Sequence, residues 1–393
     1  MEIMIDSDSF FWPSDISDEY MKEERKCISF EKYDCYSKDM LEQYYLGFRS
    51  SWFFCEDTIT EDNEKIDETL ETYRKMCLNM ALDYMMNNMN SEKSLPVDYL
   101  WIIRNLVVNA LKDKYPDIEK IEIKLSMQPR FSARTVDKNT IVIPALLRSV
   151  LIQCNLAIMN SIYDYTDGFN QSKIDTIRNS ISIDGLKCNI DQTVYNARFI
   201  FPYLLYCHDN LSVMHLPFIG ARSKDVVTYA LNFTNIQLAF IIMHEYAHIL
   251  LNHFNDNRER VAKENEADSF AIDILLEYLE KQYSKEDLLL SIRWLFKYQL
   301  LEEKMGKLVQ GESVTSFESH YQDRRVKCQY ELLTKFGEGG CSVFETIGFG
   351  MIVDLQRIIY KMGIEVINDI FEAFNKAKKT KEVEPWWKKI EQE

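Results

Sequence analysis

The stretch NIQLAFIIMHEYAHILL, residues 235–251, is apolar on every side of a helix and yet contains two histidines and a glutamate. A helix that has no polar face is buried, so we expect this stretch to form a core helix that continues to His253. Burying His244, Glu245 and His248 in such a helix costs free energy unless each of them has a partner. The stretch therefore predicts the central helix of the fold and a polar cluster within it.

The three polar residues have the spacing H-E-x-x-H. Residues four apart lie on one face of an α-helix, so both imidazoles can bind a single ion. Glu245 lies about 100° around the helix from His244, close enough to reach a water molecule on that ion. The motif thus predicts two zinc ligands, His244 and His248, and a general base for metal-assisted hydrolysis. The alternative, a pair of hydrogen-bonded core histidines, stays open.

A third metal ligand is expected in the segment Glu264-Asn-Glu-Ala-Asp268. It begins a helix predicted to run from 262 to 283, and both Glu264 and Asp268 stand seven residues before an apolar member of its inward face. We therefore expect Glu264 to bind the metal and Asp268 to orient a ligand imidazole. Glu266 falls on the opposite, solvated face. The alternative is an acidic cluster that interacts with the helix dipole.

His253 is the other candidate for the third ligand. It lies nine residues after His244, which places it about 180° around the predicted helix. The signature H-E-x-x-H-x-x-G-x-x-H also requires a glycine and a histidine where this chain has Leu251 and Phe254. We therefore interpret His253 as a residue at the helix C-terminus that interacts with the dipole.

H-E-x-x-H, a short connection and E-x-x-A-D at the start of a second helix resemble the pattern of the gluzincin metallopeptidases. The chain looks most similar to the prenyl-protein and heat-shock membrane endopeptidase group and to the soluble phage-exclusion (Lit-type) peptidases. The resemblance implies a zincin-like core, a protein or peptide substrate, and one zinc ion held by His244, His248 and Glu264. It also implies that Glu245 acts as general base, and it places the aspartate of the pattern on Asp268.

The resemblance points to two further elements. Such peptidases have an edge strand ahead of the motif helix that pairs with extended substrate, and residues 130–143 occupy that place. They also have a Ser-His-Pro stretch with a following arginine. Ser319-His320-Tyr321, followed by Arg324 and Arg325, is similar, but it lacks the proline and its arginine spacing differs. We expect His320, or a neighbouring arginine, to stabilise the oxyanion. The alternative is an exposed loop histidine.

The rest of the sequence predicts a mostly helical α+β protein. Strands are expected at 121–125, 131–135 and 140–143, the last two as a hairpin around Asp137-Lys-Asn139. Elsewhere, long apolar-periodic stretches with few glycines and prolines predict helices. We expect three regions: an acidic, aromatic-rich N-terminal helical region (1–93), a metallopeptidase core (94–284) with an insert at about 164–232, and a C-terminal helical region (285–393).

The composition of the chain restricts its expected binding partners and its expected cellular compartment. The chain has 46 Lys and Arg against 62 Asp and Glu, and the resulting net charge of −16 counts against nucleic acid as the main partner. We expect no membrane span, because no stretch reaches ~18 uninterrupted apolar residues. Residues 1–11 lack the basic region of a secretory signal, and the nine cysteines contain no C-x-x-C pair. We therefore expect a cytoplasmic protein, and no pattern predicts its oligomeric state.

These observations together predict a zinc-dependent endopeptidase. A second interpretation is a zinc-stabilised protein-interaction or sensor module without catalysis, but such a site has no use for the carboxylate of Glu245. A third is a defence or toxin protease that stays inactive until it is triggered, with residues 1–66 as a built-in inhibitor. No pattern in the sequence names the substrate or the trigger.

Overall fold

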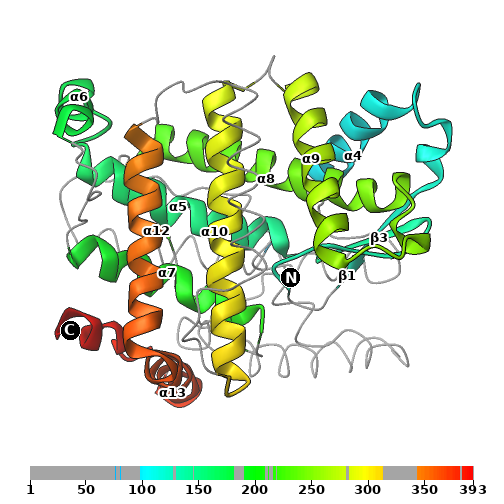
Figure 1. Ribbon diagram of the computed structural model, residues 1–393. Coiled ribbons are helices and arrows are strands. Elements are labelled where there is room, and N and C mark those ends of the chain that lie inside the picture. The colour runs from blue at the N-terminus through cyan, green and yellow to red at the C-terminus, as the bar shows by residue number, and fades with distance from the viewer. Residues whose placement is uncertain are drawn as a thin grey trace, which may run out of the picture.

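The computed structural model describes the central and C-terminal parts of the chain and little of the first 97 residues. The described residues are Met76, Met80, 98–126, 130–144, 146–180, 190–208, 211, 216–217, 219–279, 283–312, 343–380 and 383–392. They are mostly helical with one small sheet, which confirms the predicted α+β class (Figure 1).

The helices form a layered bundle. Two long helices, α10 and α12, run side by side across α5, α7 and α8, while α9, α4 and the sheet lie together at one end (Figure 1). The bounds are α4 Asp98–Leu111, η4 Pro116–Lys120, α5 Leu147–Tyr165, α6 Gln171–Ser180, α7 Ile190–Tyr206, α8 Lys224–Leu250, η6 His253–Asn255, α9 Arg260–Leu279, α10 Lys285–Val309, α12 Val343–Met362, α13 Ile364–Thr380 and η7 Trp386–Gln392.

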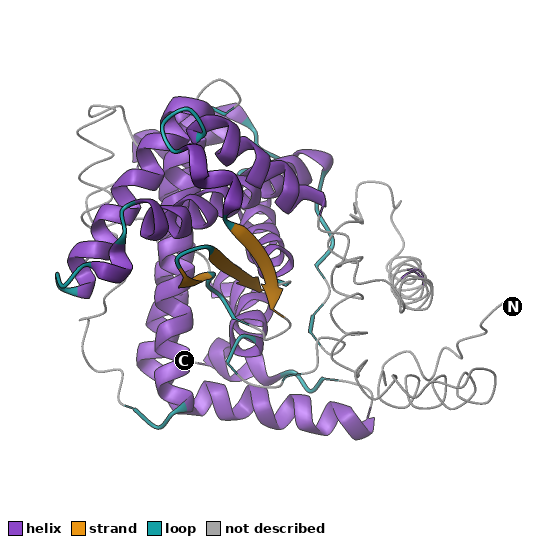
Figure 2. Ribbon diagram, turned by 90° about the vertical axis from the view of Figure 1, so that its right-hand side faces the viewer, coloured by secondary structure: helices purple, strands orange, loops and turns teal. Residues whose placement is uncertain are grey.

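The strands, drawn in orange in Figure 2, form one small sheet among the described residues. Its order is β1-β3-β2, so β2 is an edge strand. Its strands are β1 (Glu122–Ser126), β2 (Arg134–Asp137) and β3 (Thr140–Pro144). β1 runs parallel to β3, and β2 runs antiparallel to it with an irregularity between Thr135 and Asp137. The predicted hairpin is confirmed, but its first strand begins three residues later than the sequence pattern indicated.

The core helix α8 begins earlier than predicted. The side chain of Ser223 caps its N-terminus by accepting a hydrogen bond from the backbone N–H of Val226. By length and composition, α8 is the one helix of the described part that could cross a membrane. However, 67% of its most apolar window is buried inside the protein, as in the central helix of a globular core.

A buried polar network fixes α8 against two neighbouring helices. The Asn155 amide of α5 donates to Thr234 Oγ1 and to Gln237 Oε1, both at 2.9 Å. The Gln237 amide donates in turn to the carbonyl of Ser291 in α10 at 3.0 Å, and the Tyr298 hydroxyl donates to Asn155 Oδ1 at 3.2 Å. Because a one-turn slip would leave buried amides unpaired, the network sets the register of α8 and of the motif at its C-terminal end.

Close approach of α12 to α10 depends on Gly348. A Cβ atom there would overlap with Cζ2 of the fully buried Trp294 ring. We expect Gly348→Ala to lower the free energy of unfolding by about 1–3 kcal/mol, because overpacking outweighs the ~1 kcal/mol that alanine gains in helix propensity. Urea denaturation measures it. Trp294→Leu should destabilise less in the Gly348→Ala background than alone, and equal stability of Gly348→Ala and wild type would contradict the expectation.

Candidate active site

α8 and α9 bring the three predicted metal ligands together. His244 Nε2 and His248 Nε2 lie 3.0 Å apart on the C-terminal part of α8. Glu264 Oε2, from the second turn of α9, lies 3.3 Å from His244 Nε2 and 4.0 Å from His248 Nε2. One ligand atom from each residue thus falls within 4.8 Å of the other two, and the side chains are at most 15% exposed.

These residues fit a zinc ion. Two imidazole nitrogens and one carboxylate oxygen are the donor set of catalytic zinc sites, and tetrahedral ligands with bonds of about 2.0–2.1 Å stand roughly 3.3 Å apart. The observed separations of 3.0, 3.3 and 4.0 Å bracket that value. The three ligand atoms therefore have both the chemistry and the separations that a single zinc ion requires.

Asp268 contacts the first histidine on the side away from this cluster. Its Oδ1 lies 2.8 Å from His244 Nδ1, and the residue is 4% exposed. A carboxylate at Nδ1 keeps the proton of the imidazole on that nitrogen and directs Nε2 towards the other ligands. Asp268 therefore lies where the inward face of the helix predicted it.

Glu245 points to the edge strand, where sequence reasoning had identified no side chain. Its Oε2 accepts a hydrogen bond of 2.7 Å from the hydroxyl of Thr135 in β2, which also donates to the Glu245 carbonyl at 3.0 Å. The strand alternation that puts Phe131 and Ala133 inward includes Thr135, so this signal was present in the sequence. Burial, and less strongly the nearby Glu264, raises the pKa of Glu245, although His244 and Thr135 act in the opposite direction.

A cavity of about 470 Å³ opens between these elements. Its size is in the range of ligand-binding clefts. The segment that leads into β2 forms one side, and α8 and α9 form the other, with a contribution from α10. The lining residues are Ser132, Ala133, Arg134, Thr135, Phe240, Ile241, His244, Glu245, His248, His253, Phe254, Arg260, Lys263, Glu264 and Gln299. All the candidate ligands and Glu245 thus face one cavity.

The prediction that the motif helix continues to His253 and places this residue at its C-terminus is wrong. α8 ends at Leu250, and Asn252 adopts a left-handed conformation with φ 57° that reverses the chain. His253 then begins η6, is 5% exposed, and lies with its Nδ1 2.8 Å from Nδ1 of His248. The angle of about 180° between His244 and His253 does not apply, because the helix ends before His253.

The sequence also failed to predict a partner for Glu266. It is 41% exposed as expected, but its Oε2 lies 3.1 Å from His253 Nε2 and 2.5 Å from Nη2 of Arg258. Lys263 holds the same loop by donating to the carbonyls of His253 and Asp256. No periodicity could have revealed this contact, since His253 reaches Glu266 only through the turn after α8.

Two predictions fall outside the described residues. His320, with the neighbouring Ser319 and Arg324, lies in the segment 313–342, of which the structure describes nothing. The same holds for the proposed inhibitory segment 1–66. Both stay predictions from the sequence.

Residues 216–311 match the family model Peptidase U49. The matched segment contains α8 and α9, which carry the three candidate metal ligands and Glu245, together with α10, but it does not reach β2. No significant match was found among curated proteins or among solved structures. The family match supports a peptidase.

Proposed function

We propose that this chain is a cytoplasmic zinc-dependent endopeptidase in which His244, His248 and Glu264 hold one zinc ion. The observation that carries the proposal is the convergence of the three ligand atoms beside Glu245 at a single cavity. The matched peptidase family supports hydrolysis of peptide bonds. The catalytic carboxylate one residue after a ligand favours this function over a structural zinc module.

In the proposed mechanism, Glu245 moves the protons. A zinc ion held by His244, His248 and Glu264 would supply Lewis-acid activation of the attacking water and of the scissile carbonyl. The Glu245 carboxylate, whose Oε2 is held by Thr135, accepts a proton from the water and later delivers it to the leaving amine. Burial suits Glu245 to this role because it raises the pKa of the carboxyl towards neutral pH and makes the carboxylate a stronger base.

Substrate binding is proposed at the edge strand β2. Residues 132–135 line the cavity, and β2 pairs with β3 on only one of its two edges among the described strands. An extended peptide can add to such an edge through main-chain hydrogen bonds. Thr135 then connects the substrate-binding strand to the general base, since its side chain holds the Glu245 carboxylate.

Thr135→Val is expected to lower kcat by about 10- to 100-fold with a smaller change in KM. Loss of a hydrogen bond to a charged group costs about 1.5–3 kcal/mol, and the base would lose its orientation in the transition state. Steady-state kinetics on a cleaved peptide measure both constants. Thr135→Ser keeps the hydroxyl and should retain most of kcat, whereas a Thr135→Val enzyme with wild-type kcat would remove this residue from the mechanism.

The proposal is tested first by metal analysis and then by peptide cleavage. Mass spectrometry of released metal should find about one zinc per chain in the purified protein. A proteome-derived peptide library, incubated with zinc-loaded protein, should then show new N-termini that are absent with Glu245→Gln. Bound zinc without cleavage of any peptide would favour the interaction-module interpretation, and absence of bound zinc after zinc addition would refute the metal site.

A further inference from the structure

The turn after α8 places a third imidazole against the outer side of His248. The left-handed Asn252 ends the helix geometry, and His253 packs in a buried position with its Nδ1 2.8 Å from His248 Nδ1. His248 Nε2 faces the ligand cluster at the same time. His253 therefore contacts His248 at the nitrogen that would not bind metal.

In this pair, the chemistry of neutral imidazole determines which ring nitrogen carries the proton. A ring that offers Nε2 to a metal carries its proton on Nδ1. His248 Nδ1–H then donates to His253 Nδ1, so the His253 proton must be on its Nε2. That N–H in turn donates to Glu266 Oε2 at 3.1 Å. Each of these ring nitrogens is therefore either a donor or an acceptor. Each imidazole donates to the next group, from His248 through His253 to the Glu266 carboxylate.

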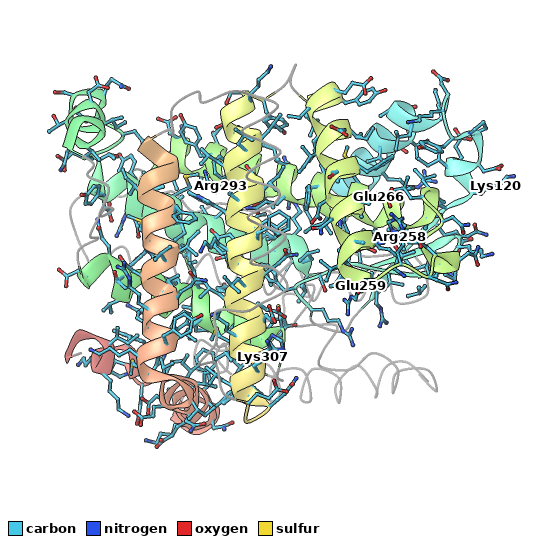
Figure 3. The ribbon with its side chains drawn as sticks, in the orientation of Figure 1. Lys120, Arg258, Glu259, Glu266, Arg293 and Lys307 are labelled. Atoms are coloured by element: carbon cyan, nitrogen blue, oxygen red, sulfur yellow. The ribbon has the colours of Figure 1, made fainter. Side chains whose placement is uncertain are left out.

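An ion pair with Arg258 holds Glu266, the last residue in this series of hydrogen bonds. Arg258 Nη2 lies 2.5 Å from Glu266 Oε2 and 2.5 Å from Asp256 Oδ2, and Figure 3 shows Arg258 close to Glu266, which belongs to α9. The guanidinium thus pairs with the same carboxylate oxygen that faces His253 Nε2, and a carboxylate in such an ion pair accepts the hydrogen bond from that imidazole. His253, Asp256 and Glu266 also have the spacing of a possible second metal site. The Arg258 guanidinium already lies between the two carboxylates and neutralises them, so we do not assign a metal ion there.

We propose that His253, held by Glu266, is a positioning residue that fixes His248 as a zinc ligand. The inference rests on the proposed metal site. It adds a contact that orients His248 to the contact by which Asp268 orients His244. His244 is oriented directly by Asp268, whereas His248 is oriented through an intervening imidazole. Contacts of this kind keep the ligand in the correct tautomer and raise its affinity for metal.

Zinc affinity tests the proposal in the full chain. Competition with a chromophoric chelator should show zinc bound about 10–100-fold more weakly by His253→Phe than by wild type. Glu266→Gln, at a half-exposed position, should change affinity in the same direction but less. His253→Gln offers an amide oxygen to His248 Nδ1–H and should recover part of the loss. Glu277→Gln, an exposed substitution further along α9, should leave affinity unchanged.

A spectroscopic measurement separates positioning from a general packing role. In zinc-loaded protein labelled with ¹⁵N-histidine, the Nδ1–H proton of His248 should give a protected resonance that is lost in His253→Phe and kept in Glu277→Gln. Wild-type affinity and an intact resonance in His253→Phe would overturn the inference and leave the proposed function standing. Two zinc ions per chain, one of them lost in Glu266→Gln, would also overturn it, because His253 would then be a ligand. A wild-type chain without zinc would refute the proposed function itself.

Discussion

Glu245→Gln is expected to lower kcat by about 10²–10⁴-fold while one zinc per chain stays bound, because general acid–base catalysis contributes a factor of this size. Glutamine keeps the shape of the side chain and can still accept the hydrogen bond from Thr135. It cannot take a proton from water at neutral pH. Initial rates on a peptide identified from the library screen, together with metal analysis of the same preparation, measure both parts of the expectation.

A matched substitution controls for the loss of a carboxylate as such. Glu277→Gln makes the same chemical change on the exposed face of α9, away from the cavity, and should keep wild-type rates. Glu245→Gln protein that still cleaves at a wild-type rate would remove Glu245 from proton transfer. The inactive, zinc-bound variant should also retain substrates, which makes it useful for capturing the natural one.

Glu264→Gln is expected to lose zinc and activity together. A neutral amide is a much poorer metal ligand than a carboxylate, so zinc content after purification should fall from about one per chain to near zero. The apo state should also be less stable, since a ligand at 100-fold its Kd contributes about 2.7 kcal/mol to folding. A chelator should therefore lower the Tm of wild type but not that of Glu264→Gln, which differential scanning calorimetry measures.

His244→Ala provides the comparison for this variant. It should lose zinc as well, but it also removes the buried contact of 2.8 Å between His244 Nδ1 and Asp268 Oδ1. Loss of a buried hydrogen bond to a charged group costs about 1.5–3 kcal/mol, so His244→Ala should have a lower Tm than Glu264→Gln even in the presence of chelator. Full zinc occupancy in Glu264→Gln would mean that the third ligand is another residue.

Sequence periodicity was enough to predict the parts of the site that depend on one helix at a time. His244 and His248 share a face because they are four residues apart, and Glu264 and Asp268 point inward because they repeat with the apolar side of α9. The apolar surroundings of the motif predicted its burial, and His244 and Glu245 are 6% and 7% exposed. The alternation of residues 131–143 predicted the hairpin of β2 and β3, in which β2 is the edge strand of the sheet.

The contacts between elements could not be predicted from periodicity, because they depend on how the elements pack. Thr135 and Glu245 are 110 residues apart in sequence, and their hydrogen bond exists because β2 packs against α8. The contact of His253 with His248 depends on one left-handed residue, Asn252, which ends the helical periodicity and turns the chain back. Periodicity describes a side chain relative to its own element, whereas these hydrogen bonds depend on how elements and turns pack together. The polar groups that orient the proposed base and the second proposed ligand were therefore visible only in the folded protein.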